Sequence, residues 1–269
     1  MKLSPILING VVSDGMIPVT DSSVLRGDGC FEVLKAYDGK PFALDGHLDR
    51  LAKSAARLDI ELPDKDDIGR WISDTARGLG DCALRVVVTR GSSVAGVEGE
   101  SLVIVFGHDW PADASAARLF PVEVPWHAAG IEWDLAGAKI LSYAPNLAAT
   151  RRATKEGFDD ALMMTVDGLV LEGPTFSVGW VIDDVLETPT LELGILDSIT
   201  RSTVLELASD LGIEVVQGRW GLDRVSSASE VMALSTIREV QVVSDIGDLT
   251  FDPGPVTERL RKAFFDLVE

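Results

Sequence analysis

Hydrophobic residues in the first third of the chain change between the two-residue period of strands and the three- to four-residue period of helices. A short strand is expected over 6–8. An alternating run over 30–37 is followed by Asp38-Gly39 and a second run over 41–44, which predicts a β-hairpin. Over 46–58, apolar residues recur on one face at spacings of three and four, which predicts a helix.

The pattern continues with one more helix and two buried strands. The helix is predicted to begin after Asp64, a residue that can cap its first turn, and to end near 78–80. Valine-rich runs over 83–89 and 102–106 are typical of buried strands. The first part of the chain is therefore expected to have an α+β fold.

The composition of the sequence then changes and its hydrophobic period is lost. Residues 109–117 are rich in Ala, Asp and Pro without a period, and a strand-like run over 119–124 follows. We therefore expect two domains, a small N-terminal α+β domain over 1–118 and a larger C-terminal domain over 119–269.

The second half opens with 131–143 and then alternates helices and strands of uneven length. This arrangement favours a mixed sheet packed with helices over a regular βαβ repeat. The expected helices are 146–156, 200–211 and a C-terminal helix after Pro255. The expected strands are 160–165, 170–171, 177–182, 214–218, 230–234 and 239–243.

Composition narrows the class of protein. The 269 residues include 24 Lys and Arg against 43 Asp and Glu, which gives a formal net charge of −19. Because polyanions are held by clustered Lys and Arg, this balance argues against nucleic acid or an anionic membrane surface as a partner. With 46% hydrophobic and 25% charged residues, the sequence is typical of a soluble globular protein.

Two further features predict a cytoplasmic location. No apolar run approaches the roughly 18 residues of a membrane span, and the apolar stretch near the N-terminus is too short for the core of a signal peptide. Cys30 and Cys82 stand alone, without a CxxC pair or a disulfide pattern, which suits a reducing compartment.

Common metal and nucleotide motifs are missing from the sequence. His47, His108 and His127 are too far apart to suggest a ligand set, and there is no H-E-x-x-H, Walker or EF-hand pattern. Gly27-Asp28-Gly29 is followed by a strand-like run over 31–34, whereas a dinucleotide fingerprint needs a helix there. We therefore expect no metal site and no Rossmann site.

One lysine stands in surroundings unlike those of the others. Lys139 lies within 136–143, with small or apolar neighbours on both sides. An ammonium group in such a place loses hydration, which lowers its pKa and favours the free amine that forms a Schiff base. The alternative is an ordinary strand lysine whose stem covers apolar surface.

Three groups with phosphate-binding chemistry occur elsewhere in the sequence. Ser198-Ile199-Thr200 opens an amphipathic helix whose N–H groups and dipole would point at an anion. Ser235-Thr236 ends a strand and turns, which supplies more donors, and Arg50 adds a fixed cation on the helix that carries His47. Each of these features is also common as a cap, a turn or a surface arginine.

Five ordered motifs resemble the fold-type IV pyridoxal-phosphate enzymes, the family of branched-chain and D-amino-acid aminotransferases and aminodeoxychorismate lyase. They cover nearly the whole chain. The resemblance implies a two-domain α+β fold like that of D-amino-acid aminotransferase, with pyridoxal 5′-phosphate held by the C-terminal domain. The motifs are 47–51 (HLDRL), 139–143 (KILSY), 167–173 (DGLVLEG), 196–201 (LDSITR) and 234–236 (LST).

The resemblance also implies roles for single residues. Lys139 would form the Schiff base with the cofactor and then act as the proton-transfer base, and Glu172 would keep the pyridine nitrogen protonated. Tyr143 would lie near the cofactor's 3′-oxygen, and Leu196 would pack on its ring. The residues that would hold the phosphate are Arg50, Ile199, Thr200 and Thr236, with Ser198 and Ser235 as further cofactor contacts.

The sequence departs from the family pattern at the edge of the expected pocket. Ser177 and Gly179 stand where the family often has Asn and Phe, and Ser198 stands where glycine is usual. None of these changes removes a catalytic group. We expect them to reshape the pocket.

The favoured reaction follows from two segments. Residues 26–32 and 89–92 resemble those of aminodeoxychorismate lyases, which release pyruvate to give 4-aminobenzoate. The alternatives are an aminotransferase acting on D-amino acids, (R)-amines or branched-chain amino acids, and a non-catalytic cofactor-binding protein. Arg26 and Arg90 are candidates to meet a substrate carboxylate. The resemblance also implies a homodimer.

Overall fold

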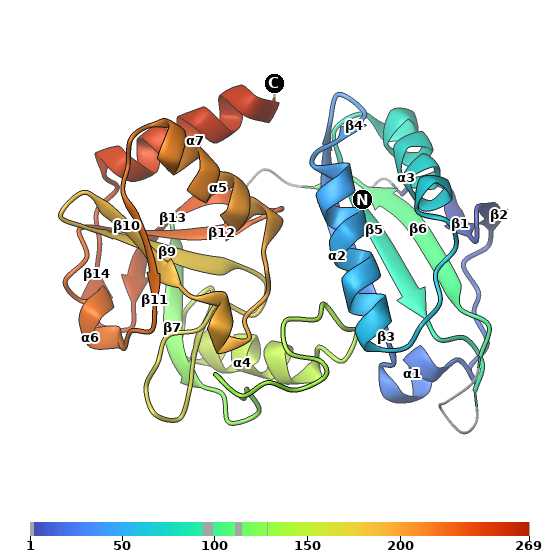
Figure 1. The fold of residues 1–269 in the computed structure, drawn as a ribbon, viewed down its shortest axis with the longest axis horizontal. Helices are drawn as coiled ribbons and strands as arrows, with labels where there is room; N and C mark the ends of the chain where they lie inside the picture. Colours follow the sequence, from blue (N-terminus) through green and yellow to red (C-terminus); the bar gives the residue numbers. More distant parts are fainter. Residues whose placement is uncertain (1–2, 94–98, 111–114, 128, 269) are drawn as a thin grey trace. The chain divides into compact units, whose positions relative to one another are not determined.

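The computed structural model describes residues 3–93, 99–110, 115–127 and 129–268. Contacts divide the chain into two units. The first takes residues 1–112 and 138–143, and the second takes 113–137 and 144–269. Each unit has its own sheet (Figure 1), and the predicted α+β class is confirmed. Among the described residues, no helix is both long and apolar enough to cross a membrane.

The first unit is a six-stranded sheet in the order β2-β1-β6-β5-β3-β4, in which every pairing is antiparallel. The predicted hairpin and both valine-rich strands are therefore present. The strands are β1 (Ile6–Ile8), β2 (Val11–Ser13), β3 (Gly29–Tyr37), β4 (Lys40–Pro41), β5 (Cys82–Thr89) and β6 (Leu102–His108). The helices are α1 (Ser22–Arg26), α2 (Leu44–Arg57) and α3 (Lys65–Leu79).

The core of the first unit lies between the sheet and helices α2 and α3, which cover the same face (Figure 1). Leu34 of β3 and Val86 of β5 point into it, as the two-residue period of strands requires. Leu51 of α2 and Ile72 of α3 meet them from the helices. The alternation along β3 therefore separates residues that face the core, including Cys30 and Glu32, from Phe31 on the opposite face.

Local capping explains where two helices of the first unit begin. Asp64 accepts a hydrogen bond from the backbone N–H of Asp66 at 2.8 Å and caps α3, as predicted. Asp21 caps α1 in the same way by accepting from Ser23. The helix α1 was not expected, because five residues are too few for a hydrophobic period to appear.

The second unit is an eight-stranded sheet in which β7 pairs with β13 and β8 in parallel, so this sheet is mixed as predicted. The strands are β7 (Ala117–Glu123), β8 (Asp160–Met164), β9 (Ser177–Ile182), β10 (Val185–Pro189), β11 (Val215–Gly218), β12 (Glu230–Ser235), β13 (Glu239–Ile246) and β14 (Leu249–Thr250). The helices are α4 (Ala144–Lys155), the 3₁₀ turn η1 (Leu191–Leu193), α5 (Ile199–Asp210), α6 (Leu222–Val225) and α7 (Pro255–Val268).

The sheet of the second unit is packed on both faces. In β8, Leu162 belongs to one hydrophobic cluster and Met163 to another, so this strand is buried on both sides. Helix α4 packs on β7 and β8, and helices α5 and α7 pack on β12. Strand β10 was missed by the sequence analysis because a glutamate, Glu187, interrupts its apolar run. The carboxylate of Glu187 is buried and accepts from Trp180 Nε1 at 2.9 Å.

The segment 138–143 was treated as part of the second half, but it joins the first unit. The N–H of Phe31 donates to the carbonyl of Lys139 at 3.0 Å, and the N–H of Leu141 donates to the carbonyl of Gly29 at 2.8 Å. These bonds make a short bridge with β3. The division proposed from the sequence, 1–118 and 119–269, differs from this partition for that reason, and its boundary falls inside β7.

Removing the cap of α3 gives a first test of the fold. We expect Asp64→Ala to lower the free energy of unfolding by about 1 kcal/mol, because an N–H group of the first turn loses its acceptor. Asp74→Ala on the same helix removes only an exposed ion pair with Arg77 and should cost less than about 0.5 kcal/mol. Urea denaturation of the three proteins measures the difference, and equal losses would contradict the capping role.

Candidate active site

Lys139 lies beside two aromatic rings of the first unit. Its Nζ is 4.4 Å from the ring centroid of Phe31 and 5.8 Å from that of Tyr143. The two rings meet edge to face, with centroids 5.2 Å apart. The backbone N–H of Lys139 donates to Ser54 Oγ of α2 at 3.1 Å. The structure therefore brings Lys139 and Tyr143 together, fixes the lysine's backbone at two points, and places its Nζ beside both rings.

Arg50 lies in a buried ion pair that the sequence analysis did not predict. Its Nε and Nη2 donate to the two oxygens of Glu32 at 2.7 and 2.8 Å. His47, one turn earlier on α2, approaches the same carboxylate through Nδ1 at 2.8 Å. All three side chains are less than a tenth exposed. The guanidinium of Arg50 is thus held in one orientation from inside the core.

Burial and charge act in opposite directions on this cluster. Burial, the largest effect, would raise the pKa of Glu32, but the charge and hydrogen bonds of Arg50, helped by His47, together lower the pKa of the carboxyl to about 2. For His47, burial lowers the pKa of the ring and outweighs the bond to Glu32. At neutral pH the imidazole is therefore uncharged, and its Nδ1–H donates to the carboxylate, which can only accept.

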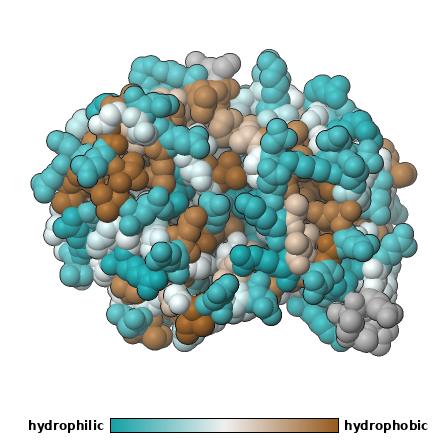
Figure 2. Space-filling view, in the orientation of Figure 1, coloured by the Kyte–Doolittle hydropathy of each residue, from teal (hydrophilic) through white to brown (hydrophobic). Residues whose placement is uncertain are grey.

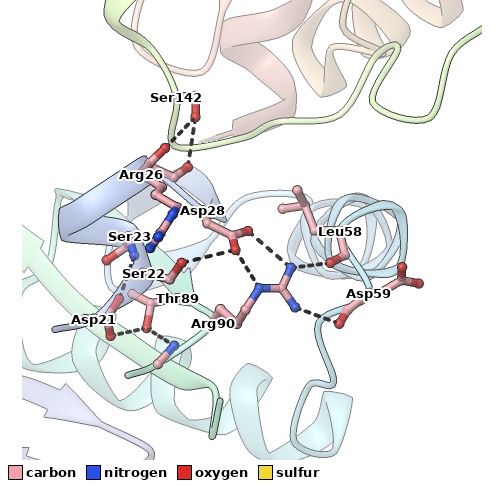
Figure 3. A network of polar contacts seen from close by, with 12 residues as sticks. Asp21, Ser22, Ser23, Arg26, Asp28, Leu58, Asp59, Thr89, Arg90 and Ser142 are labelled. Atoms are coloured by element: carbon pink, nitrogen blue, oxygen red, sulfur yellow. Dashed lines mark hydrogen bonds and ion pairs between the residues drawn. The ribbon is translucent and has the colours of Figure 1, made fainter. Parts of the chain in front are cut away.

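Arg90, a candidate for binding a substrate carboxylate, donates to acceptors of the first unit on all sides (Figure 3). Its Nε and Nη2 donate to the carboxylate of Asp28 at 2.5 and 3.2 Å. The guanidinium also donates to the carbonyls of Leu58 and Asp59, just beyond α2. Arg90 would have to leave Asp28 to take a substrate carboxylate. Arg26, the other candidate, ends the short helix α1 and is exposed.

In the second unit, the start of α5 presents backbone donors that the helix itself cannot use. Ser198 caps the helix, and its Oγ accepts from the N–H of Arg201 at 3.3 Å. The N–H groups of Ile199 and Thr200, in the first turn, have no carbonyl within the helix to donate to. Ser198 and Thr200 are both buried. The predicted helix start is thus present, with the Oγ of Ser198 accepting within the helix; its binding of an anion stays a prediction.

Arg201 adds a buried positive charge at this helix start. The guanidinium donates to Thr188 Oγ1, the carbonyl of Pro189 and Gln217 Oε1, at 3.2, 2.9 and 2.6 Å. These are neutral oxygens, and no carboxylate forms an ion pair with Arg201 within the described part of the chain. Burial lowers the pKa of its guanidinium, against the opposing charges of Asp197 and Glu172. The sequence analysis missed this residue.

Glu172 and Leu196 are neighbours in the second unit. The N–H of Leu196 lies 3.2 and 3.3 Å from the two carboxylate oxygens of Glu172 and donates to them. The backbone of Glu172 is held by β8, since its carbonyl accepts from the N–H of Met163 at 2.9 Å. The carboxylate of Glu172 thus has a fixed position.

The turn after β12 carries the remaining predicted residues. Ser235 is buried, and its Oγ accepts from the N–H of Arg238 at 3.1 Å, which closes the turn over Thr236. The residues assigned to the cofactor are therefore divided between the units. Arg50, Lys139 and Tyr143 lie in the first unit, with the substrate candidates Arg26 and Arg90, and the other cofactor residues lie in the second. No group of three metal-ligating side chains occurs among the described residues.

The signal for the missed residue Glu32 was present in the sequence. Glu32 is the one acid on the core-facing side of β3, between Cys30 and Leu34. A buried carboxylate needs a cation or several donors, so its partner had to lie on the helix that packs on β3. The spacing of His47 and Arg50, three residues apart, places them on one face of that helix.

Replacing Glu32 tests this cluster. We expect Glu32→Gln to lower the free energy of unfolding by about 3 kcal/mol at pH 7, because Arg50 stays buried without its counter-ion. The folded pKa of about 2 lies below the ordinary 4.5, so the wild-type advantage is full above pH 4.5 and is lost as pH falls toward 2. Urea denaturation between pH 2 and pH 7 measures the difference in the free energy of unfolding between wild type and Glu32→Gln. Glu206→Gln, at an exposed position of α5, is the control. A difference in the free energy of unfolding that stays the same in acid would contradict the ion pair of Glu32 with Arg50.

Known proteins resemble this chain over most of its length. The model of the class IV amino-transferase family matches residues 29–246. A branched-chain-amino-acid aminotransferase of Methanocaldococcus jannaschii, described as putative, is 31% identical over 264 residues, with 94% of this chain and 92% of the relative covered. A bifunctional aminodeoxychorismate lyase / D-amino acid transaminase of Mycobacterium tuberculosis is 31% identical over 222 residues, with 74% and 75% covered.

A solved structure agrees with the fold. A branched-chain amino acid aminotransferase from T.th., complexed with N-(5′-phosphopyridoxyl)-L-glutamate, superposes with a TM-score of 0.91 at 27% identity, with 100% of this chain and 95% of that chain covered. The family match covers most of the chain and includes Lys139, Glu172 and the start of α5. The chain therefore belongs to the class IV aminotransferase family, whose members are fold-type IV enzymes that depend on pyridoxal 5′-phosphate.

Proposed function

We propose that this protein is a 4-amino-4-deoxychorismate lyase that also transfers amino groups. The observation that carries the catalytic part of the proposal is the position of Lys139, whose backbone is fixed by β3 and α2 and whose amine lies against Phe31 and Tyr143. A fixed amine beside aromatic faces suits an enzyme that binds an aldehyde cofactor through lysine and then uses the same amine to move a proton.

The donor set fits pyridoxal 5′-phosphate. Buried N–H and hydroxyl groups at the start of α5 and in the turn at Ser235 suit the phosphate, and Arg50 adds a cation held by Glu32. The fixed carboxylate of Glu172 suits the pyridine nitrogen. Ser177, whose strand position pairs with Leu234, has a buried Oγ without a hydrogen-bond partner among the described residues, which a bound polar group would satisfy.

The cofactor, when bound, supplies an aldehyde that reacts with amines and a ring that withdraws electrons. Lys139 would hold the cofactor through its amine, and the same amine, once free, would take the proton from the carbon that bears the substrate's nitrogen. Glu172, as an ionised carboxylate, keeps the ring nitrogen protonated. Arg50 and the N–H groups of Ile199 and Thr200 hold the phosphate, and Leu196 and Tyr143 orient the ring.

The two reactions differ after that proton has left. In the lyase reaction, enolpyruvate leaves the neighbouring carbon of the substrate and tautomerises to pyruvate. The substrate's own six-membered ring becomes aromatic and is released as 4-aminobenzoate. In amino transfer, Lys139 would return the proton to a different carbon. The substrate would leave as a keto acid without its amino group, which a second keto acid would then receive. The lyase proposal is supported by segments 26–32 and 89–92, and the relative from Mycobacterium tuberculosis bears the names of both activities.

Amino transfer is the second candidate activity. It is favoured by the branched-chain aminotransferases among the similar proteins, at 31% identity for the relative from Methanocaldococcus jannaschii. D-amino acids, (R)-amines and branched-chain amino acids are the donor classes to test. Arg26, exposed at the end of α1, and Arg90, which would first have to leave Asp28, remain the two candidates to meet a substrate carboxylate.

We also propose that the protein is a cytoplasmic homodimer. Large apolar side chains are exposed along one stretch of the first unit, including Val11, Val12, Met16 and Val19, each more than two thirds exposed. Figure 2 shows hydrophobic atoms at the outer edge of this unit, where β2 lies in Figure 1. A second copy of the chain would cover such a stretch.

Cys30 and Cys82 are buried free thiols, and burial raises the pKa of Cys30 to about 12, which keeps it unreactive.

Replacing the lysine tests the catalytic assignment. Wild-type protein with added pyridoxal phosphate should show the visible absorbance of a Schiff base, and Lys139→Ala should lose that absorbance and about 99% or more of turnover. Lys53→Ala, which removes an exposed lysine of α2, is the matched control and should keep both. Wild-type protein without the absorbance would favour a non-catalytic protein, and full turnover by Lys139→Ala would remove the role of Lys139.

Product analysis separates the two reactions. We expect 4-aminobenzoate and pyruvate in equal amounts from aminodeoxychorismate, at a higher kcat/KM than amino transfer from D-alanine, (R)-1-phenylethylamine or L-leucine to a keto acid. Chromatography of both product sets from one enzyme preparation gives the ratio. Rapid amino transfer without 4-aminobenzoate would reverse the order of the two proposed activities.

A further inference from the structure

Arg238 links two segments of the second unit that are assigned to the cofactor. It is the last residue of the turn after β12, where its N–H donates to Ser235 Oγ at 3.1 Å. Its guanidinium points back into the unit, where Nη2 donates to Asp160 Oδ2 and Nη1 donates to Gln241 Oε1, both at 2.8 Å. Asp160 begins β8 and is buried. The turn that carries Ser235 and Thr236 is thus tied to β8.

The face of the same guanidinium lies on Phe176. Its Cζ is 4.6 Å from the centroid of the Phe176 ring. Phe176 belongs to the segment that follows Glu172: its carbonyl accepts from the N–H of Gly173 at 2.7 Å. A Cβ at position 173 would lie 2.1 Å from the Phe176 ring, so only glycine fits there. The Phe176 ring therefore rests directly on the residue after Glu172.

These contacts form one continuous path. Ser235 and Thr236, assigned to the phosphate, are connected through Arg238 and Phe176 to Gly173 and so to Glu172, assigned to the pyridine nitrogen. Phosphate and ring nitrogen are separate parts of one small molecule, joined by the ring and a short ester linker. A protein that binds both parts tightly must therefore hold the two segments at a fixed separation.

We propose that Arg238 is a positioning residue that sets the separation of the 235–238 turn and the 172–176 segment. This inference rests on the proposed function, which assigns those segments to pyridoxal phosphate. The planar guanidinium suits the task because it pairs with Asp160 through its edge and stacks on Phe176 through its face. Lysine has no planar face, so it would keep the charge and lose the stacking contact.

The second unit contains a matched control. Arg118 of β7 also lies over a phenylalanine, with its Cζ 5.0 Å from the ring centroid of Phe158, and it forms an ion pair with Asp245 at 3.6 Å. Its Nη1 also donates to the carbonyl of Gly157 at 3.0 Å. These contacts touch neither of the two cofactor segments. Arg118→Met therefore removes the same kinds of interaction without changing their separation.

The experiment compares wild type, Arg238→Met and Arg118→Met as holoenzymes and after removal of the cofactor. We expect Arg238→Met to raise the Kd for pyridoxal phosphate by about tenfold and to reduce the visible circular dichroism of the bound cofactor. Pyridoxal, which lacks the phosphate, and inorganic phosphate each span only one of the two segments, so Arg238→Met should change the Kd of each by less than about threefold. Arg238→Lys should recover only part of the affinity. Arg118→Met should change each value by less than about twofold.

Each outcome decides the matter. Equal Kd and circular dichroism for Arg238→Met and Arg118→Met would overturn the proposal. A Kd for pyridoxal or for inorganic phosphate raised as much as the Kd for pyridoxal phosphate would also overturn it, since damage within one segment would then explain the loss. Urea denaturation of both variants separates a shift of the two segments from general unfolding. Wild-type protein that binds no pyridoxal phosphate would instead overturn the proposed function, and this inference with it.

Discussion

Two backbone hydrogen bonds between β3 and the segment 138–143 decide where the candidate catalytic lysine lies. They join Phe31 to Lys139 and Gly29 to Leu141, so a segment that follows β7 in the sequence returns to the first sheet. Because side chains alternate along β3, Phe31 lies beside Lys139 while Glu32 enters the core and holds Arg50. One strand therefore orients two of the predicted cofactor residues, one through each face.

A chain with a large negative net charge can bind an anionic cofactor if positive groups and N–H donors lie close to the anion. A formal charge of −19 opposes anions at long range, so an anion site needs short-range donors. Arg50 is compensated by Glu32, which lowers the cost of burying it and fixes its direction. Arg201 donates instead to neutral oxygens, so its charge adds to the positive end of α5. The acidity of the chain is thus no obstacle to a phosphate.

The sequence predicted most helices and strands because their hydrophobic periods are long, as in α2 and α3. It missed short elements, among them α1 and β10, since five residues show no helical period and Glu187 breaks an apolar run. The strand expected over 170–171 is wrong, because Val170 makes only an isolated bridge with Met164. Lys139 was singled out from its neighbours alone, but its pairing with β3 joins residues more than a hundred positions apart, which no local pattern records. Glu32, Arg201 and Arg238 were missed because their importance depends on which element packs on which.

The departure of this chain from its family at Ser198 has a specific physical consequence. In place of the usual glycine, Ser198 caps α5 with its own hydroxyl, which is used on the N–H of Arg201. Oγ accepts in that bond and can still donate its O–H, so an anion at the helix start would meet this hydroxyl beside the N–H groups of Ile199 and Thr200. Backbone donors cannot rotate away as a side chain can. The serine therefore caps the helix through a lone pair of Oγ and keeps its O–H as one more donor at the helix start, which a glycine there would lack.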